Sequence, residues 1–411
     1  MKSDIIIIGG GAAGSFAAIT AARMDRTVTL LEKNEKIGRK LRITGKGRCN
    51  VTNNCTWQEA MNSVPVNPRF LYSAFSGFQP QDVMNFFEEL GVPLKTERGN
   101  RVFPLSDKSS DILKAYNKAL QKYAVEVKLN EKVLTIEKVE RGFEVKTDKN
   151  EYFFDKVVVA TGGITYPQTG STGDGYKFAE RFGHEIKKPI GVLNGLITKE
   201  KPDLAGLTLK NVTFTIEKKD KVIYSELGEL LFTHKGISGP IVLTASSKIA
   251  EENFTELFSY IDLKPALSFE QLDARILRDF EENKNKSFKG ALDKLLPQRL
   301  IDEVVKRCGI DRNKKVNSIT KKEREALTKT LKKFVVTITS LEDDSLAIIT
   351  KGGVDVREID PKTMQSIKCE GLYFVGEVLD VDAKTGGFNL QIANASGALC
   401  GRAIGGQGND R

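Results

Sequence analysis

Two glycine-rich turns, one near each end of the 411-residue chain, constrain its fold more than any other feature. The first, Gly9 to Gly14, follows four consecutive isoleucines, Ile5 to Ile8. A continuous apolar run of this kind is typical of a strand buried on both faces of a parallel sheet. The second, Gly386-Gly387, comes shortly after another strand-like segment, Leu372 to Val375. The pair predicts a nucleotide-binding α/β domain whose two halves come from opposite ends of the chain.

The composition bounds the class of protein. With 411 residues, 40% of them apolar, the chain can bury more than one core, so we expect two or three domains. The cysteines form no C-x-x-C pair, which argues against a disulfide framework and against a metal site. They are Cys49, Cys55, Cys308, Cys369 and Cys400.

The N-terminal apolar run is too short for a signal peptide, and no run approaches the length of a membrane span. We therefore expect a soluble cytoplasmic protein with no membrane partner. The net charge of +9 allows two interpretations: attraction of nucleic acid or other anions, or simple solvation of the surface. We favour solvation, because no arginine-rich run interleaved with aromatic residues occurs.

The pattern along the chain predicts a nucleotide domain interrupted by an insertion. The first strand, a helix over 12–24 and a second strand over 27–31 make a βαβ start, and short alternating strands follow over 125–154. After Pro189 the pattern indicates antiparallel sheet over about 207–264 and then lysine-rich helices. We expect the nucleotide-binding domain to comprise residues 1–190 and 346–411. The inserted domain is expected over 191–345, with β-barrel-like sheet over 191–267 and 335–345 and helices over 268–334.

The first glycine turn has the spacing Gly-x-Gly-x-x-Gly. In this motif Gly9 permits the tight turn, Gly11 lets the backbone approach a pyrophosphate, and Gly14 allows close packing of helix on strand. Glu32, at the end of the second strand, is placed to accept hydrogen bonds from ribose hydroxyls. The loop from Lys33 to Asn53 adds cations and backbone donors suited to a pyrophosphate, an anionic flavin or an anionic substrate.

The C-terminal turn completes a long cofactor site. Leu372 to Gly376 delivers Glu377 to a glycine turn, where it or Asp380 could bind ribityl hydroxyls. Gly386-Gly387 opens the last helix, so free N–H groups face the position before it. A helix N-terminus there would stabilise the negative charge that forms at N1 and C2=O of a reduced flavin. The cofactor that spans both turns is therefore expected to be FAD.

These motifs together resemble a known family, the bacterial BaiN-like flavoproteins, also called NAD(FAD)-utilising dehydrogenases or aminoacetone-oxidase-like proteins. The resemblance spans nearly the whole chain and rests on the first turn, residues 38–50, 160–175, 231–240 and 371–389. It implies noncovalent FAD in a domain like those of glutathione reductase and fumarate reductase flavoprotein. It also implies an inserted domain with a small β-barrel and a helical bundle. Lys46 departs from the family pattern, in which glycine is common there, and this argues against a tight backbone approach.

The resemblance also assigns cofactor contacts to particular residues. The pyrophosphate and ribose contacts are Gly9, Gly11, Ala12, Ala13, Gly14, Glu32 and Lys33. Contacts near the phosphates and flavin ring are Arg39, Lys40, Arg48, Cys49 and Asn50, and those around the nucleotide are Val133, Ala160, Thr161 and Gly162. The flavin side is completed by Gly376, Glu377, Asp380, Gly387, Asn389 and Leu390.

The expected activity is that of an FAD-dependent oxidoreductase. Relatives imply reduction of a carbon–carbon double bond conjugated to a ketone, with flavin N5 giving hydride to the β-carbon and an acid protonating the α-carbon. His234, in a glycine-bounded loop of the insertion, is the candidate acid, and Arg48 is the candidate for polarising the carbonyl. We expect His184 to be structural and Cys49 to be inert unless a base lies near it.

Two hypotheses remain open from the sequence. No second Gly-x-Gly-x-x-Gly unit occurs between 190 and 345, so NAD(P)H is expected to visit the flavin transiently, if it is the electron donor. The first hypothesis is an oxidoreductase of a small conjugated carbonyl compound. The second is a nucleic-acid-associated flavoprotein, an RNA modifier or binder, motivated by the basic helices in 284–333. The oligomeric state is not indicated by the sequence.

Overall fold

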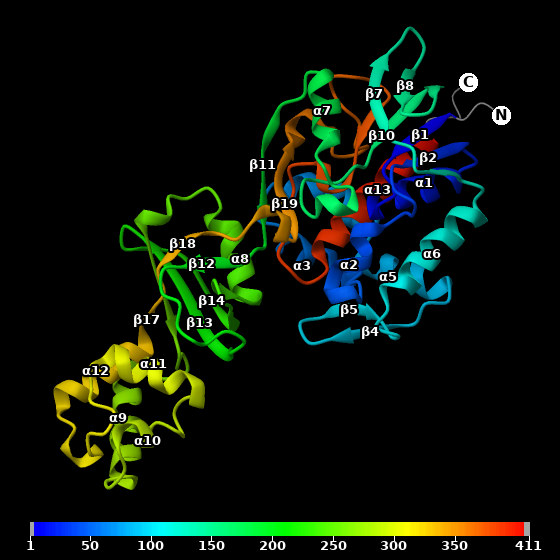
Figure 1. Ribbon diagram of the computed structural model, residues 1–411. Coiled ribbons are helices and arrows are strands. Elements are labelled where there is room, and N and C mark those ends of the chain that lie inside the picture. The colour runs from blue at the N-terminus through cyan, green and yellow to red at the C-terminus, as the bar shows by residue number, and fades with distance from the viewer. Residues whose placement is uncertain (1–3, 407–411) are drawn as a thin grey trace. The chain divides into compact units, whose positions relative to one another are not determined.

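The computed structural model describes residues 4–406, which form two compact units. Unit 1 combines Met1–Val192 with Asp344–Arg411, and unit 2 is the intervening Leu193–Asp343 (Figure 1). Each unit has its own buried apolar cluster. Within residues 4–406, no helix combines the length and the apolar composition that crossing a bilayer requires. The same range contains no group of His, Cys, Asp and Glu side chains that could hold a metal ion.

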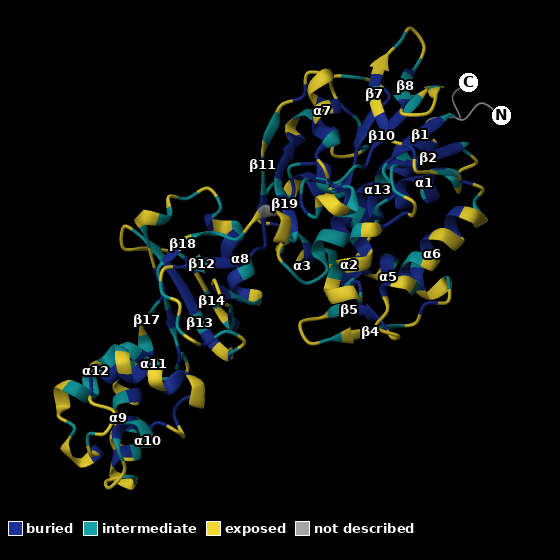
Figure 2. Ribbon diagram, viewed as in Figure 1, coloured by how far each residue is buried: buried dark blue, intermediate teal, exposed yellow. Residues whose placement is uncertain are grey.

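Unit 1 is built on a five-stranded parallel sheet with the order β20-β10-β1-β2-β6. Its strands are β1 (Ile5–Ile8), β2 (Val28–Glu32), β6 (Glu126–Leu129), β10 (Lys156–Val159) and β20 (Leu372–Phe374). The predicted burial of the isoleucine run is confirmed, because Ile5 to Ile8 are at most 5% exposed (Figure 2). The central strand β1 pairs with β2 from the start of the chain and with β10, which in turn pairs with β20 from the end.

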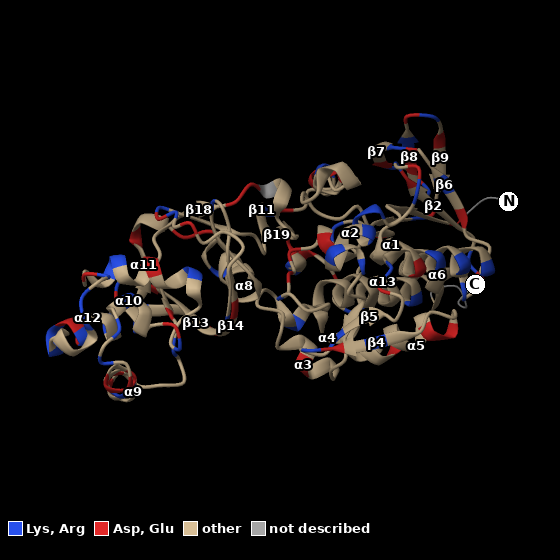
Figure 3. Ribbon diagram, turned by 60° about the horizontal axis from the view of Figure 1, so that its bottom comes forward, with Lys and Arg blue, Asp and Glu red and all other residues tan. Residues whose placement is uncertain are grey.

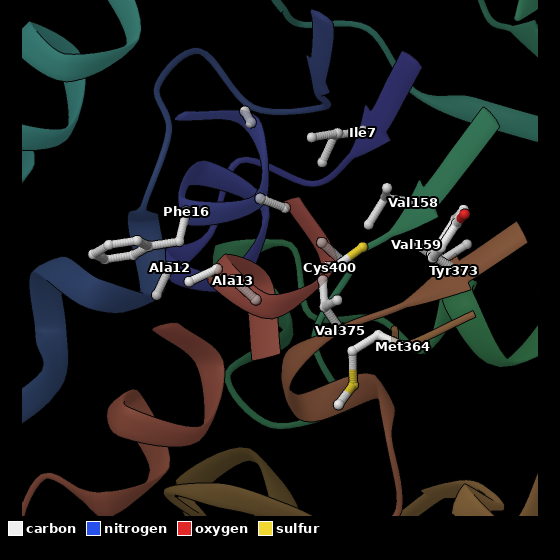
Figure 4. Close-up of a cluster of buried hydrophobic side chains, with 14 of the residues drawn as sticks. Ile7, Ala12, Ala13, Phe16, Val158, Val159, Met364, Tyr373, Val375 and Cys400 are labelled. Atoms are coloured by element: carbon white, nitrogen blue, oxygen red, sulfur yellow. The ribbon is translucent and has the colours of Figure 1, made fainter. Parts of the chain in front are cut away.

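Two helices rich in small residues, one from each end of the chain, pack against each other. In α1 (Ala12–Ala22) and α13 (Phe388–Gly406) the backbones approach closely. A Cβ at Gly397 would lie 2.2 Å from the carbonyl oxygen of Ala13, and one at Gly401 would lie 2.7 Å from that of Ala17. Figure 4 shows Ala12 and Ala13 of α1 with Cys400 of α13 and Val158 of β10 in one buried cluster.

The remaining helices and strands of unit 1 surround this sheet. Three-stranded antiparallel sheets are formed by β3-β5-β4 and by β7-β8-β9, and β11 pairs antiparallel with β19. The helices are α2 (Arg39–Gly47), α3 (Trp57–Met61), α4 (Tyr72–Gly77), α5 (Pro80–Glu89), α6 (Ser109–Lys122) and α7 (Asp174–Arg181). The strands are β3 (Thr52–Asn53), β4 (Leu94–Glu97), β5 (Arg101–Pro104), β7 (Val133–Lys138), β8 (Phe143–Thr147), β9 (Glu151–Phe154), β11 (Ile186–Val192) and β19 (Ile349–Val354).

Unit 2 contains a seven-stranded sheet with the order β17-β16-β13-β14-β15-β12-β18. The outer strands β17 (Phe334–Val335) and β18 (Ile338–Leu341) are joined by only two residues, so the sheet curls back on itself as a small barrel. Val336 supports the closure, because its N–H donates to the carbonyl of Ser259. The other strands are β12 (Leu196–Thr198), β13 (Thr208–Lys218), β14 (Lys221–Phe232), β15 (Gly236–Ser238) and β16 (Leu257–Asp262).

The helices of unit 2 include one that the sequence pattern did not predict. The segment 207–264 was expected to be sheet throughout, but α8 (Pro240–Ile249) interrupts it. Pro240 occupies the first helical position, where its fixed φ and missing N–H are tolerated, and its short apolar run is ambiguous between strand and buried helix. The lysine-rich segment is helical as expected, with α9 (Phe269–Glu282), α10 (Phe288–Ala291), α11 (Gln298–Cys308) and α12 (Lys321–Lys332).

The close contact of α1 with α13 yields a stability prediction. Replacing Gly397 with Ala places a methyl group against the backbone of α1, and overpacking of this kind costs about 1 to 3 kcal/mol of the free energy of unfolding. Gly406→Ala is the matched control, because a Cβ there meets no atom within 4 Å. Urea unfolding followed by circular dichroism should show a lower midpoint for Gly397→Ala alone. Equal midpoints would refute the tight contact.

Candidate functional site

The N-terminal glycine turn joins β1 to α1. A Cβ at Gly9 would lie 2.5 Å from the carbonyl oxygen of Ala160, and one at Gly14 would lie 2.0 Å from the carbonyl oxygen of Gly9. Gly9 also has a φ of 109°, which an L side chain rarely adopts. Gly11 differs from both: its φ is −78° and a Cβ there would meet nothing within 4 Å. Gly11 therefore borders open space in front of the first turn of α1.

The first turn of α1 and its surroundings leave polar atoms for a ligand. Gly11 is the N-cap and brings no side chain to the free N–H groups, which favour an anion. Among the described residues, the buried side-chain atoms without a hydrogen-bond partner include Ser15 Oγ in this turn, Thr161 Oγ1 next to Gly9, and Asn50 Oδ1 in the loop after α2. A buried polar atom left unpaired costs about 1 to 3 kcal/mol. The free N–H groups and the two hydroxyls can donate to the phosphate end of a dinucleotide, whereas Asn50 Oδ1 can only accept a hydrogen bond.

Glu32 braces the turn from the end of β2. Its Oε2 accepts the N–H of Gly10 at 2.9 Å, and its Oε1 accepts the backbone N–H of Asn34 at 3.0 Å and its side-chain Nδ2 at 2.6 Å. The carboxylate is 8% exposed and retains lone pairs on both oxygens. The expected role of Glu32 in binding the ribose stays a prediction. Its hydrogen bond to the N–H of Gly10 is a second role, which the sequence did not indicate.

Two cations of the following loop are held by neighbouring side chains. Lys33 Nζ lies 2.7 Å from Asp174 Oδ2 and donates to the hydroxyl of Thr172. Arg39 donates to Asn34 Oδ1 at 3.1 Å. Lys33 precedes helix α2, Arg39 is the first residue of this helix, and the helix breaks at Thr44.

An ion pair joins the two ends of the chain. Lys40 Nζ lies 2.7 Å from Glu377 Oε2 and also donates to the hydroxyl of Thr165 at 2.7 Å. Glu377 Oε1 accepts the backbone N–H of Thr350 at 2.8 Å. Both Lys40 and Glu377 were expected at the cofactor, from motifs more than 300 residues apart. The structure brings them into direct contact within unit 1.

Arg48, Cys49 and Asn50 follow the break in α2. Arg48 pairs with Glu97 at 2.8 Å and Asp107 at 3.2 Å, and its guanidinium carbon lies 4.0 Å from the ring centroid of Phe103. The hydrogen bond with Glu97 is the main reason that the pKa of Arg48 is raised. These contacts hold Arg48 in one orientation. Complete burial raises the pKa of Cys49 to about 12, which agrees with an inert thiol.

The middle of the chain contributes the edge of β10 and the start of β7. Ala160 and Val133 are both 6% exposed, and Gly162 has a φ of 72°. Near Thr161, the buried hydroxyl of Tyr176 also lacks a hydrogen-bond partner. Burial, and then the charges of Glu377 and Asp380, raise the pKa of Tyr176, so its hydroxyl is a neutral donor for a ligand or water.

The C-terminal turn is held by contacts with Ala13 and Asn67. Gly376 has a φ of 76°, and a Cβ there would lie 2.7 Å from that of Ala13. Asn67 Nδ2 donates to the carbonyl and to Oδ2 of Asp380, while burial raises the pKa of this carboxyl. Asp380 is therefore held by Asn67.

The start of α13 lies against β3. A Cβ at Gly387 would lie 2.3 Å from the carbonyl oxygen of Thr52, and Asn53 Nδ2 donates to the carbonyl of Gly386. Asn389 closes its own turn, because its amide exchanges two hydrogen bonds with the backbone of Ala383. Leu390 follows in the first turn of the helix, half-buried. The N-terminus of α13 is thus placed directly beside the segment that follows Asn50.

The two histidines lie in different surroundings. His234 is exposed in unit 2, at a tight turn in which Thr233 N–H donates to the carbonyl of Gly236. All expected cofactor residues belong to unit 1. His184 is buried in unit 1, where its Nδ1 lies 3.1 Å from Glu358 and its Nε2 lies 2.8 Å from Ser366 Oγ, consistent with a structural role.

Sequence reasoning missed several polar residues of this region. Thr165 and Thr350 hold Glu377 from two further segments, and Asn67 holds Asp380. No motif marks Asn67 or Thr165. Thr350 stands before Gly352-Gly353, a glycine pair with φ of 86° and 133°, and that pair was the one signal that could have drawn attention to it.

Comparison with known proteins places the chain in a family. The model of the HI0933-like protein Rossmann domain matches residues 3–403. The chain is 32% identical to the ribosomal RNA dihydrouridine synthase of Escherichia coli over 98% of both chains. It is 31% identical to the 3-dehydro-bile acid delta(4,6)-reductase of Clostridium scindens over 97% of this chain and 98% of the relative.

Solved structures share the fold. The 3-ketosteroid-delta4-(5alpha)-dehydrogenase of Rhodococcus jostii covers 98% of this chain and 97% of its own, with a TM-score of 0.54 and 14% identity. The 3-ketosteroid delta1-dehydrogenase of Sterolibacterium denitrificans gives a TM-score of 0.53. The predicted α/β fold of Rossmann type is confirmed, and the chain belongs to the HI0933-like Rossmann-domain family of FAD-dependent oxidoreductases.

Proposed function

We propose that this protein is a reductase of a carbon–carbon double bond conjugated to a carbonyl group, with noncovalent FAD in unit 1. The observation that carries the proposal is the contact between Lys40 and Glu377, which joins the two glycine turns into one extended site. FAD is a dinucleotide, and it is long enough to contact both glycine turns at once. Bound there, FAD would supply two-electron reduction at N5 of its ring.

The residues of unit 1 have distinct roles toward such a cofactor. The open face of Gly11 and the first turn of α1 would receive the pyrophosphate. Lys40 and Thr350 orient the carboxylate of Glu377, which would accept the ribityl hydroxyls. The N-terminus of α13, beside Gly387, would face the pyrimidine edge and favour negative charge there.

The relatives support the type of bond reduced. A delta(4,6)-reductase of a 3-dehydro-bile acid saturates double bonds conjugated to a ketone. A dihydrouridine synthase saturates the uracil 5,6 double bond, which is conjugated to the C4 carbonyl. The two names therefore describe one kind of reduction on two very different molecules. A small enone is our first candidate substrate, and NADH or NADPH is our candidate electron donor.

His234 and Arg48 remain proposals as the acid and the carbonyl-polarising cation. Arg48 is engaged by Glu97 and Asp107, so polarising a substrate would require it to share these contacts. His234 is exposed and so is accessible to a ligand in solution. Tyr176, with its unpaired buried hydroxyl, is a further candidate donor that arises from the structure.

A uridine in RNA is the second candidate substrate, and the charge distribution favours it. Residues 268–334 contain 18 Lys and Arg against 11 Asp and Glu, so most of the net charge of +9 lies in this helical part of unit 2. The charge is therefore concentrated in one part of the chain, which weakens our preference for simple solvation of the surface. Figure 3 shows the Lys and Arg positions on α11 and α12. Exposed cations without a carboxylate partner among the described residues include Lys286, Lys306, Lys322 and Lys329.

Removing the open space at Gly11 tests the cofactor site. Gly11→Ala keeps an ordinary φ and meets no protein atom, so we expect the cofactor-free protein to fold with a loss of about 1 kcal/mol or less. Its FAD dissociation constant, measured by fluorescence titration, should rise by about tenfold or more, since the methyl group occupies the pyrophosphate space. Gly14→Ala is the contrasting variant and should lower the melting temperature of the cofactor-free protein. An unchanged FAD affinity in Gly11→Ala would refute the placement.

An anaerobic experiment tests the reaction. The FAD-loaded protein should lose its visible flavin absorbance on addition of NADH or NADPH, and a conjugated enone should restore it. Saturated ketones are the control, since they lack the double bond. If neither nicotinamide bleaches the flavin, the protein requires another electron donor. Dithionite is then used to reduce the flavin before the enone is added. If no enone and no uridine-containing RNA reoxidises the reduced flavin, the proposed function is wrong.

Charge reversal in unit 2 tests the RNA alternative. A triple variant, Lys306→Glu, Lys322→Glu and Lys329→Glu, should weaken binding of a ribosomal RNA fragment and lower the slope of log affinity against log salt by about 3. The control reverses three exposed lysines of unit 1, Lys149, Lys188 and Lys362, and changes the net charge equally. Equal effects of the two triples in a filter-binding titration would mean nonspecific attraction and would exclude a specific role for α11 and α12.

A further inference from the structure

Lys46 stands in an unusual backbone conformation in the cofactor loop. Helix α2 breaks at Thr44, after which Gly45 has φ and ψ of 57° and 33°, and Lys46 has 59° and 42°. Gly47 continues in the left-handed region with a φ of 85°. Glycines adopt this conformation without penalty, whereas a residue with a Cβ does so at a cost in free energy. A lysine between two glycines in this conformation calls for a function that offsets the cost.

Its charge is also unmatched. Lys33, Lys40 and Arg48 of the same loop each pair with a carboxylate at 2.8 Å or less. Arg39 lies 3.6 Å from Glu35. Lys46 is exposed, and within residues 4–406 its ammonium group makes no ion pair or hydrogen bond, which is also true of the exposed side chains of Lys36 and Arg42 in this loop.

A second lysine with a left-handed backbone, Lys219, provides a comparison for Lys46. Lys219 is the other described lysine with a left-handed backbone, at a φ of 49°. It lies in the two-residue turn between β13 and β14 with Asp220, also left-handed, and such hairpin turns require this conformation at both positions. Lys46 has no hairpin to close, because it interrupts a helix. The hairpin turn therefore accounts for the left-handed backbone of Lys219, and no hairpin turn accounts for that of Lys46.

The surroundings of Lys46 point to a ligand. A Cβ at Gly45 would lie 3.1 Å from the backbone nitrogen of Asn50, so the break in α2 packs against Asn50. The side-chain Oδ1 of Asn50 is buried without a partner. Three residues further on, Asn53 donates to the carbonyl of Gly386 at the start of α13. The loop that carries Lys46 therefore borders the N-terminus of α13, where the flavin ring is proposed to lie.

We propose that Lys46 is a substrate-binding residue whose ammonium group holds the carbonyl oxygen of the conjugated substrate at the flavin edge. The inference rests on the proposed function and adds Lys46, as a specificity-determining residue, to Arg48 as a second cation proposed for this oxygen. A cation at this oxygen stabilises the negative charge that develops there as the double bond is reduced. Substrate rather than cofactor is the assigned partner, because Lys46 is exposed to solvent, from which the substrate enters. Of the cations expected at the cofactor, Lys33, Lys40 and Arg48 are half-buried and held by carboxylates, whereas Arg39 is exposed.

Three variants test the inference. Lys46→Asn removes the charge but suits the left-handed backbone, since Asn is enriched there. Lys46→Arg keeps the charge. Lys219→Asn makes the same chemical change at the hairpin, and the wild-type protein is the reference. The measurements are the melting temperature of the cofactor-free protein, the FAD dissociation constant, and the reoxidation of dithionite-reduced protein by 2-cyclohexen-1-one and 4-androstene-3,17-dione.

The expected result is a separation of stability from substrate binding. Lys46→Asn and Lys219→Asn should each raise the melting temperature by about 1 to 2 °C, because both relieve backbone strain. Only Lys46→Asn should raise the substrate concentration for half-maximal reoxidation, by about tenfold or more, which is the loss of one charged hydrogen bond. Lys46→Arg should keep this substrate concentration close to that of the wild type. The FAD dissociation constant should stay within about twofold of the wild-type value in all variants.

Other outcomes overturn the inference. An unchanged half-maximal concentration in Lys46→Asn excludes Lys46 from substrate binding. A weaker FAD affinity with unchanged substrate dependence makes Lys46 a cofactor residue instead. Failure of wild-type protein to be reoxidised by either enone, or by uridine-containing RNA, refutes the proposed function and with it this inference. That failure is distinguishable because it appears in the wild type, whereas failure of the inference alone appears only in the variant.

Discussion

The backbone contact between α1 and α13 is the interaction on which the rest of unit 1 depends. Gly397 and Gly401 lie so close to the carbonyls of Ala13 and Ala17 that no side chain fits between the helices. The same contact brings Gly376 against Ala13, so the turn after β20 meets the helix that follows β1. Small residues along both helices are therefore a requirement for one continuous cofactor site built from the two ends of the chain.

Charge pairing gives this site its order. Lys33, Lys40 and Arg48 are each held by a carboxylate from a distant segment, and the partners Asp174, Glu377 and Glu97 come from three different parts of unit 1. Half-buried pairs of this kind contribute modestly to stability but fix side-chain direction. Contacts within the protein therefore fix the direction of these three cations. Lys46 differs from these three in combining an exposed ammonium group with a left-handed backbone, and from this combination we infer a role at the substrate.

The sequence predicted the turns and missed the residues that support them. Gly9, Gly11 and Gly14 follow a fixed spacing after an apolar strand, so their backbone roles could be deduced locally. Thr165, Thr350 and Asn67 carry no local pattern, because each acts on a carboxylate supplied by another segment. Helix α8 was expected to be sheet because a short buried apolar run suits either element, and only packing inside unit 2 decides between them.

The sequence by itself determined the FAD-binding α/β class and the positions of the glycines. Glycine is favoured wherever the backbone is left-handed and required where it lies too close to another segment for a side chain, so these positions can be recognised from the sequence. It also determined that the basic helices lie in one stretch of chain. Only the tertiary structure decided that Lys40 pairs with Glu377, that Gly11 borders open space while Gly14 does not, and that Lys46 is strained and unpaired. Pairing, open space and backbone strain depend on segments that are far apart in sequence and meet only after folding.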